Sequence, residues 1–122
     1  MLFDTRYFWA VFTTKDSEAL GKLRALFDRS KPAYTSSICV YEVYKLTLAA
    51  EGKAVAELRA STMERDFHIV DVDAGIAREG AAIAQRLRVP MADALIMATA
   101  SRLRLPCVTD DPHFTDAKTT WI

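Results

Sequence analysis

The sequence predicts an α/β fold, a three-layer α/β/α sandwich built around a short parallel sheet. Short apolar segments alternate with segments of helical spacing along the whole chain, and strands separated by helices favour parallel pairing with helices on both faces. Residues 91–103 are apolar on nearly every side, which is typical of a helix buried between other elements. A chain of 122 residues without a Gly- or Ser-rich linker is expected to form a single domain, residues 1–122.

In the first half of the chain, turn and capping residues separate the expected elements. Asp16 or Ser17 can cap a helix with apolar residues at helical spacing, and the pair Lys31–Pro32 ends it. Ser37 can cap the next helix, and Gly52 closes it. The expected elements are a strand over Met1–Asp4, a helix over Tyr7–Phe12, a helix from Ser17 to about Arg29, a strand over Ala33–Ser36 and a helix over Cys39–Ala50.

The second half begins with a helix whose expected buried face includes Val55, Leu58 and Met63. Asp73 is placed to cap a later helix, and Pro90 precedes the buried one. The expected elements are a helix over Ala54–Arg65, a strand over Phe67–Val72, a helix over Gly75–Arg88, a helix over Met91–Leu103, a strand over Leu105–Thr109, a turn or short helix over Pro112–Asp116 and a strand over Thr119–Ile122.

Composition and charge place the chain among ordinary globular proteins. Half of the residues are hydrophobic (51%), a quarter are charged (26%), and sixteen basic side chains balance sixteen acidic ones. Zero net charge excludes a strongly basic tail that grips nucleic acid by bulk electrostatics, but it leaves nucleic acid open as a substrate. The two Cys form no paired motif, and the sequence contains no leader-like segment or membrane-length apolar run, so we expect a cytoplasmic protein without a membrane segment.

Five acidic residues interrupt apolar segments at strand ends or helix starts. Asp4 ends the first strand, Glu42 and Asp93 lie in the opening turns of two helices, and Asp110 and Asp111 follow a later strand. In a parallel sheet these positions converge on the carboxyl edge, where ligand sites form. Each acid alone has an ordinary explanation as a helix cap, a dipole partner or a turn residue. Together they would repel one another without a cation, and Mg²⁺ or Mn²⁺ suits such a site and phosphodiester chemistry.

Three segments resemble the PIN domain family, in order and at suitable spacings along the whole chain. They are Asp4-Thr5 after the first strand, the stretch Ala-Asp-Ala-Leu-Ile-Met-Ala-Thr-Ala that begins at Ala92, and the Thr-x-Asp-x-x-Phe pattern that begins at Thr109. Glu42 in a helix start completes the pattern. Within the family, the chain is similar to the small VapC-type toxins of toxin–antitoxin pairs.

The resemblance implies a Mg²⁺- or Mn²⁺-dependent endoribonuclease that cleaves single-stranded RNA, the toxin of a type II toxin–antitoxin pair. Thr5 and Thr109 match polar positions that hydrogen-bond the acids. Arg6 stands where the family more often has Ser or Asn, and it is a candidate substrate contact together with His113. The catalytic residues and metal ligands would be Asp4, Glu42, Asp93 and Asp111, with Asp110 as a further ligand.

The resemblance also implies a single-stranded or structured RNA as the bound substrate, an antitoxin partner whose C-terminal segment covers the acidic site, and a homodimer or higher homo-oligomer. Three other functions remain open: a non-catalytic PIN-like module that binds RNA or protein, a housekeeping RNA-processing nuclease, and a phosphoacceptor signalling domain. The last type carries an acidic pair early in the chain, whereas the pair here comes late. If four acids bind metal, sixteen bases face twelve other acids, and the remainder has a net charge of +4 that an RNA backbone tolerates.

Overall fold

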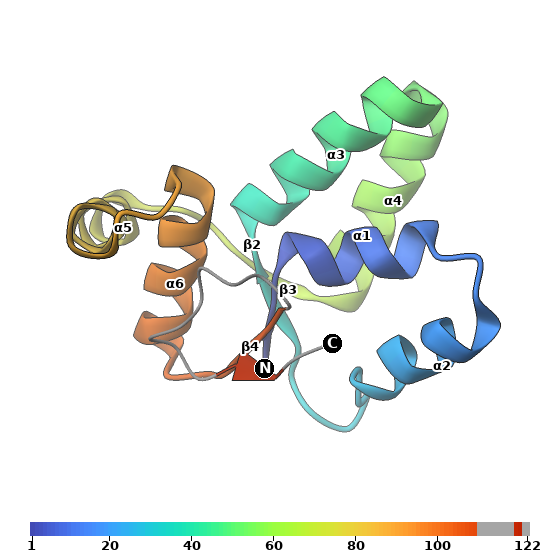
Figure 1. Cartoon of the computed structure of the whole chain (residues 1–122), viewed down its shortest axis with the longest axis horizontal. Helices are drawn as coiled ribbons and strands as arrows, with labels where there is room; N and C mark the ends of the chain where they lie inside the picture. The colour runs from blue at the N-terminus through green and yellow to red at the C-terminus, as the bar shows by residue number, and fades with distance from the viewer. Residues whose placement is uncertain (110–118, 121–122) are drawn as a thin grey trace.

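Helices alternate with short strands in the computed structural model, which describes residues 1–109 and the strand at 119–120 (Figure 1). The turn or helix expected over Pro112–Asp116 lies outside the described residues. The elements are β1 (Leu2–Phe3), α1 (Thr5–Thr13), α2 (Ser17–Ala25), β2 (Tyr34–Ser36), α3 (Ser37–Glu51), α4 (Lys53–Asp66), β3 (His68–Val70), α5 (Ala74–Leu87), α6 (Met91–Leu103), β4 (Cys107–Val108) and β5 (Thr119–Thr120).

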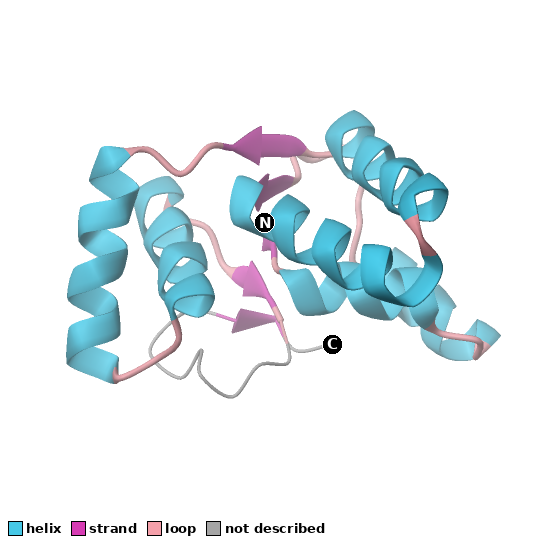
Figure 2. Cartoon of the chain, turned by 90° about the horizontal axis from the view of Figure 1, so that it is seen from above, coloured by secondary structure: helices cyan, strands magenta, loops and turns pink. Residues whose placement is uncertain are grey.

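The strands form one parallel sheet in the order β3–β2–β1–β4–β5. β1 is central, and its Leu2 pairs with Tyr34 of β2 on one side and with Cys107 of β4 on the other. The chain moves outward from β1 to β3 and then crosses back to β4. Right-handed connections therefore put α1–α4 on one face of the sheet and α5 and α6 on the other (Figure 2). The predicted three-layer α/β/α sandwich is confirmed.

The helix α6 is buried on most of its surface, as its composition predicts. It packs against α5, where a Cβ atom on Gly80 would lie 2.8 Å from Leu95 Cδ2, so only glycine allows this close approach without a shift of Leu95. Asp73 caps α5 as expected and pairs with Arg102 of α6 at 2.6 Å. No helix in the described part of the chain is both long and apolar enough to cross a bilayer. The buried side chains of α6 are Ala94, Ile96, Met97, Ala98, Thr99 and Ala100.

Aromatic side chains fill the space between the sheet, α1 and α2. The ring of Phe67 lies between three others, with centroid distances of 5.3 Å to Phe3, 4.8 Å to Phe8 and 5.1 Å to Phe27. Tyr7 packs on Phe3 at 4.6 Å, and its ring is buried. Rings at these distances in tilted or edge-on arrangements attract each other beyond the burial of their area, so they fix α1 and α2 against the sheet.

Two helix starts differ from the sequence-based expectation. α1 begins at Thr5, two residues early, because the side chain of Asp4 caps it. The cap of α3 is Ser36, so the expectation that Ser37 caps it is wrong. The Ser37 hydroxyl instead accepts a hydrogen bond of 3.2 Å from the backbone N–H of Val72, and it thereby ties the segment after β3 to the start of α3.

The end of α2 and the buried face of α4 also differ. α2 ends at Ala25 rather than near Arg29, since the next two backbone N–H groups bond carbonyls three residues back and tighten the last turn. On α4, the expected inward residue Leu58 is wrong, because its side chain is 66% exposed. The buried stripe of this helix consists of Ala56, Arg59, Ala60 and Met63.

Arg59 is a buried cation that joins α1, α3 and α4. Its guanidinium pairs with Glu51, donates to the Thr47 hydroxyl at 3.2 Å and donates to the Phe12 carbonyl oxygen at 3.3 Å. It also lies over the rings of Trp9 and Phe12, 5.7 and 5.5 Å from their centroids. A planar group that donates several hydrogen bonds and stacks on rings is specific to arginine. This contact fixes the hairpin of α3 and α4 against α1.

We predict that Arg59→Ala lowers the free energy of unfolding by about 2–3 kcal/mol, because it removes charge-assisted hydrogen bonds and leaves their partners unpaired. Urea unfolding followed by circular dichroism measures this loss. Arg65→Ala is the matched control, since Arg65 lies on the same helix but is largely exposed and, among the described residues, forms an ion pair with the adjacent Asp66 alone. An equal shift of both unfolding midpoints would contradict the role of Arg59.

Candidate active site

Several elements present their ends at the carboxyl edge of the sheet. β1 and β2 lead directly into α1 and α3, so both helices begin at this edge. α6 runs back to the amino end of β4, so its own N-terminus lies at the carboxyl edge as well. Figure 1 shows the first turns of these three helices gathered above the sheet, and both α1 and α6 contact α3. The topology therefore brings Asp4, Glu42 and Asp93 to the same edge.

The carboxylate of Asp4 is almost completely buried, with 2% of the residue exposed. Its Oδ1 accepts hydrogen bonds from the backbone N–H groups of Arg6 and Tyr7, at 3.1 and 3.3 Å, as the cap of α1. Its Oδ2 accepts a 2.5 Å hydrogen bond from the hydroxyl of Thr109, which follows β4. Donors on both oxygens offset part of the cost of burying a charge, so Asp4 is held in one orientation.

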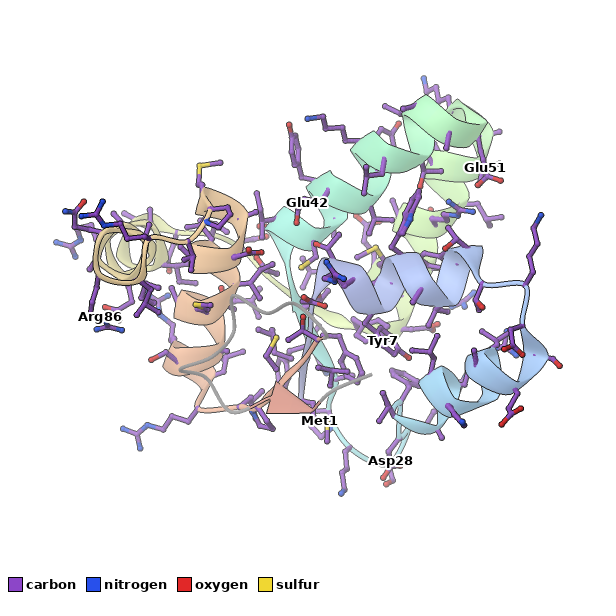
Figure 3. All side chains as sticks on the ribbon, viewed as in Figure 1. Met1, Tyr7, Asp28, Glu42, Glu51 and Arg86 are labelled. Carbon is purple, nitrogen blue, oxygen red and sulfur yellow. The ribbon has the colours of Figure 1, made fainter. Side chains whose placement is uncertain are left out.

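Glu42 lies in the first half of α3, at the end where this helix approaches α1 and α6 (Figure 3). The hydroxyl of Thr5 donates a 2.6 Å hydrogen bond to its Oε1. Because Thr5 directly follows Asp4, this bond ties the two acidic segments together. Among residues 1–109, Thr5 is the only hydrogen-bond partner of the Glu42 carboxylate, so Oε2 is open.

The buried thiol of Cys39 is affected by the charges of both carboxylates. Burial, with the negative charges of Asp4 and Glu42 adding to it, raises the pKa of Cys39 to about 12, and the nearby hydroxyls of Thr35 and Thr5 act against this rise. Both carboxylates therefore act on the same buried point. With this pKa the thiol stays protonated at physiological pH, which makes Cys39 an inert packing residue.

The positions of the other predicted site residues are less closely defined. Asp93 is half-buried in the first turn of α6, and Arg6 is exposed on α1. Asp110, Asp111 and His113 lie outside the described residues. Within residues 1–109, no three His, Cys, Asp or Glu side chains are arranged to hold a metal ion. The described part of the chain thus brings together the pair Asp4–Glu42 with its two threonines, and the full ligand set stays a prediction.

The chemistry of the paired groups nevertheless fits a hard divalent cation. The donors are carboxylate oxygens, which Mg²⁺ and Mn²⁺ prefer, and Glu42 Oε2 is open to bind one. Sequence reasoning missed Cys39 and Thr35 beneath the acids. Thr35 is fully buried and donates to the Phe3 carbonyl oxygen at 2.7 Å. For Thr35, the only sequence signal was the presence of a polar threonine in a strand that helices cover on both faces.

Solved structures similar to this chain include proteins of toxin–antitoxin systems. A chain of the toxin–antitoxin complex from Klebsiella pneumoniae is 26% identical, with 98% of this chain and 94% of that chain covered and a TM-score of 0.77. A chain of VapBC2 from Rickettsia felis, bound to a promoter DNA fragment, is 14% identical, with 99% and 97% covered and a TM-score of 0.79.

VapC20 from Mycobacterium tuberculosis, described as a toxin that cleaves the sarcin–ricin loop, is 17% identical, with 87% and 85% covered and a TM-score of 0.74. The similarities to VapBC2 and VapC20, both below 25% identity, establish a shared fold. A comparison with curated proteins found no match. The sequence model of the PIN domain matches residues 1–119, which is nearly the whole chain. The protein therefore belongs to the PIN domain family.

Proposed function

We propose that the protein is a metal-dependent endoribonuclease that cleaves single-stranded RNA and acts as the toxin of a type II toxin–antitoxin pair. The observation that carries the proposal is the buried Asp4 carboxylate beside Glu42 at the carboxyl edge of a PIN domain. Burying an acid next to a second one is costly, and a site for a divalent cation gives that arrangement a purpose. The similarity to a K. pneumoniae toxin–antitoxin protein supports the biological role.

The ion would be held by the acids of this edge and would supply Lewis-acid activation of a water molecule and charge neutralisation at phosphorus. Thr109 and Thr5 orient the carboxylates of Asp4 and Glu42 through the hydrogen bonds described above. Glu42 Oε2, which Thr5 leaves open, is available to bind the ion or to accept a proton from the attacking water. The proposed ligands are Asp4, Glu42, Asp93 and Asp111, with Asp110 as a further ligand.

Substrate contacts in this proposal come from cations beside the acids. Arg6 is exposed on the first turn of α1, two residues after Asp4, and this position supports it as the proposed contact to a phosphate of RNA. His113 is proposed as a second contact. A homodimer or higher homo-oligomer and a cytoplasmic location complete the proposal.

We predict that the purified protein cleaves single-stranded RNA with Mg²⁺ or Mn²⁺ and that Asp93→Asn lowers the rate by at least about 100-fold. The substitution removes one negative charge from the ligand set and retains the size of the side chain. Cleavage of a labelled RNA on a denaturing gel measures the rate, and circular dichroism checks the fold.

The control for this experiment is Asp71→Asn, which neutralises an exposed acid after β3, outside the proposed site. Undiminished cleavage by folded Asp93→Asn protein would show that a contaminating nuclease or a different site does the chemistry. If the wild-type protein cleaves no RNA with either metal, the non-catalytic PIN-like module is favoured instead. If it cleaves RNA but no antitoxin exists, a housekeeping RNA-processing nuclease is favoured.

Metal binding gives a second prediction, independent of the substrate. A ligand that binds only the folded state stabilises it by about 1.4 kcal/mol when its free concentration is ten times its Kd. We therefore expect Mn²⁺ to raise the thermal unfolding temperature of the wild-type protein and EDTA to reverse the rise. Glu42→Gln should reduce the effect, whereas Glu64→Gln, an exposed acid on α4, should retain it. Equal stabilisation of both variants would place the bound metal elsewhere.

A groove between α1, α2 and the end of α4 supports an antitoxin as partner. It has a volume of about 590 Å³, and aromatic side chains such as Phe12 and Phe67 line it. Arg24, Arg29 and Arg65 line it as well. Asp66 is the one acidic residue of the described lining. A groove with aromatic rings and a surplus of basic groups is complementary to a helical segment that carries apolar and acidic residues. We propose that part of the antitoxin binds in this groove.

We predict that Arg24→Glu weakens co-purification with the product of a small reading frame directly upstream of the gene. Charge reversal at the groove should repel acidic residues of the partner, and tagged pull-down after co-expression measures the retained fraction. Lys22→Glu, an exposed site on the same helix outside the groove lining, is the matched control. Equal retention of the partner by both variants would exclude the groove as its binding site.

A further inference from the structure

Tyr41 and Lys45 form an exposed pair on α3 beside the candidate site. Tyr41 is 59% exposed to solvent, which is unusual for a large aromatic residue on a packed helix. The Lys45 Nζ atom lies 5.9 Å from the centroid of this ring, so the cation is held over the ring face. The two side chains therefore present one aromatic and one cationic group together.

Helix geometry places this pair next to Glu42 (Figure 3 labels Glu42). With 3.6 residues per turn, Lys45 lies about 60° around the helix from Glu42 and about 40° from Tyr41, between the two. Residues three apart on a helix are neighbours, about 5–6 Å between their Cβ atoms. The surface of α3 thus carries a track that runs from the candidate metal ligand to a cation and then to an aromatic ring.

Apart from each other, the two groups have no hydrogen-bond or ion-pair partner in the described part of the chain. The Tyr41 hydroxyl makes no hydrogen bond there, and no carboxylate lies within ion-pair distance of Lys45. Tyr44, on the same helix, is the contrast, because its hydroxyl donates to Glu57 of α4 at 2.8 Å and the residue is half-buried. Packing of the α3–α4 hairpin therefore explains Tyr44 and does not explain Tyr41 or Lys45.

Single-stranded RNA has the complementary chemistry. Its unpaired bases stack on exposed aromatic rings, and its phosphates pair with nearby cations. We propose that Tyr41 stacks on a base of the RNA substrate and that Lys45 binds an adjacent phosphate, so that the strand leaves the candidate site across α3. The inference rests on the proposed nuclease function and assigns two substrate-binding residues to it. Because a base within a duplex is not free to stack on a side chain, the pair selects single strands.

The test compares kinetics and binding of variants on one single-stranded oligoribonucleotide. Tyr41→Ala should raise KM about tenfold with kcat within twofold, the expected loss for one stacked base, and Tyr41→Phe should retain the wild-type KM because the ring remains. Lys45→Gln should weaken binding and reduce the slope of log K against log salt by about 0.7, the value for one phosphate contact on a single strand. Tyr44→Ala and Lys53→Gln are the matched controls. The first removes an aromatic ring and the second a positive charge, both outside the track.

A spectroscopic readout separates stacking from a structural effect. In the Asp93→Asn background, which prevents turnover, RNA carrying 2-aminopurine should lose fluorescence on binding, and Tyr41→Ala should abolish that quenching. The absence of both cleavage and RNA binding in the wild-type protein would mean that the proposed function itself fails. Cleavage by the wild-type protein with an unchanged KM and unchanged quenching in Tyr41→Ala would overturn this inference alone. A change in sedimentation mass in Tyr41→Ala, with KM unchanged, would also overturn it and assign Tyr41 to a contact between copies of the chain.

Discussion

The buried carboxylate of Asp4 is the interaction on which the rest of the site depends. It ends the central strand, caps α1 through two backbone N–H groups and accepts the hydroxyl of Thr109 after β4. One side chain thus joins the end of β1 and the start of α1 to a residue 105 positions further along the chain. A neutral residue of the same size would serve as a cap equally well. The cation proposed for the edge would give the buried carboxylate a role beyond the capping of α1.

The parallel sheet explains why the acids converge. Strands of two or three residues leave little distance between the core and the carboxyl edge, so helices begin almost directly above the sheet. α1, α3 and α6 direct their N-termini toward this edge, and the partial positive charge of a helix N-terminus favours nearby carboxylates. The hydroxyls of Thr109 and Thr5 then fix one carboxylate oxygen each, on Asp4 and on Glu42. The topology of the sheet brings the acids to the same edge, and the hydroxyl groups fix the orientation of their carboxylates.

The sequence was sufficient for those features that rest on strong local patterns. The composition of 91–103 predicts a buried helix, Asp73 is the cap it was expected to be, and alternation of strands with helices predicts the layers. The sequence was insufficient where a tertiary contact decides which residue is buried or which residue caps a helix. Arg59 occupies the buried face of α4 in place of Leu58 because rings and carbonyls from α1 and α3 surround it. Ser37 leaves the cap of α3 to its neighbour because its hydroxyl bonds a distant segment.

For the site, position at a strand end or helix start was the useful signal, because it depends only on the connectivity of the sheet. It predicts that Asp4 and Glu42 lie at one edge, and the family resemblance pointed to Thr5 as a residue that hydrogen-bonds the acids, whereas no pattern in the sequence placed the thiol of Cys39 within reach of both charges. The most direct test of the central claim is anomalous diffraction from crystals soaked in Mn²⁺. The account predicts a manganese peak within coordination distance of the Asp4 and Glu42 carboxylates. A fully occupied peak elsewhere, with none between these two side chains, would contradict it.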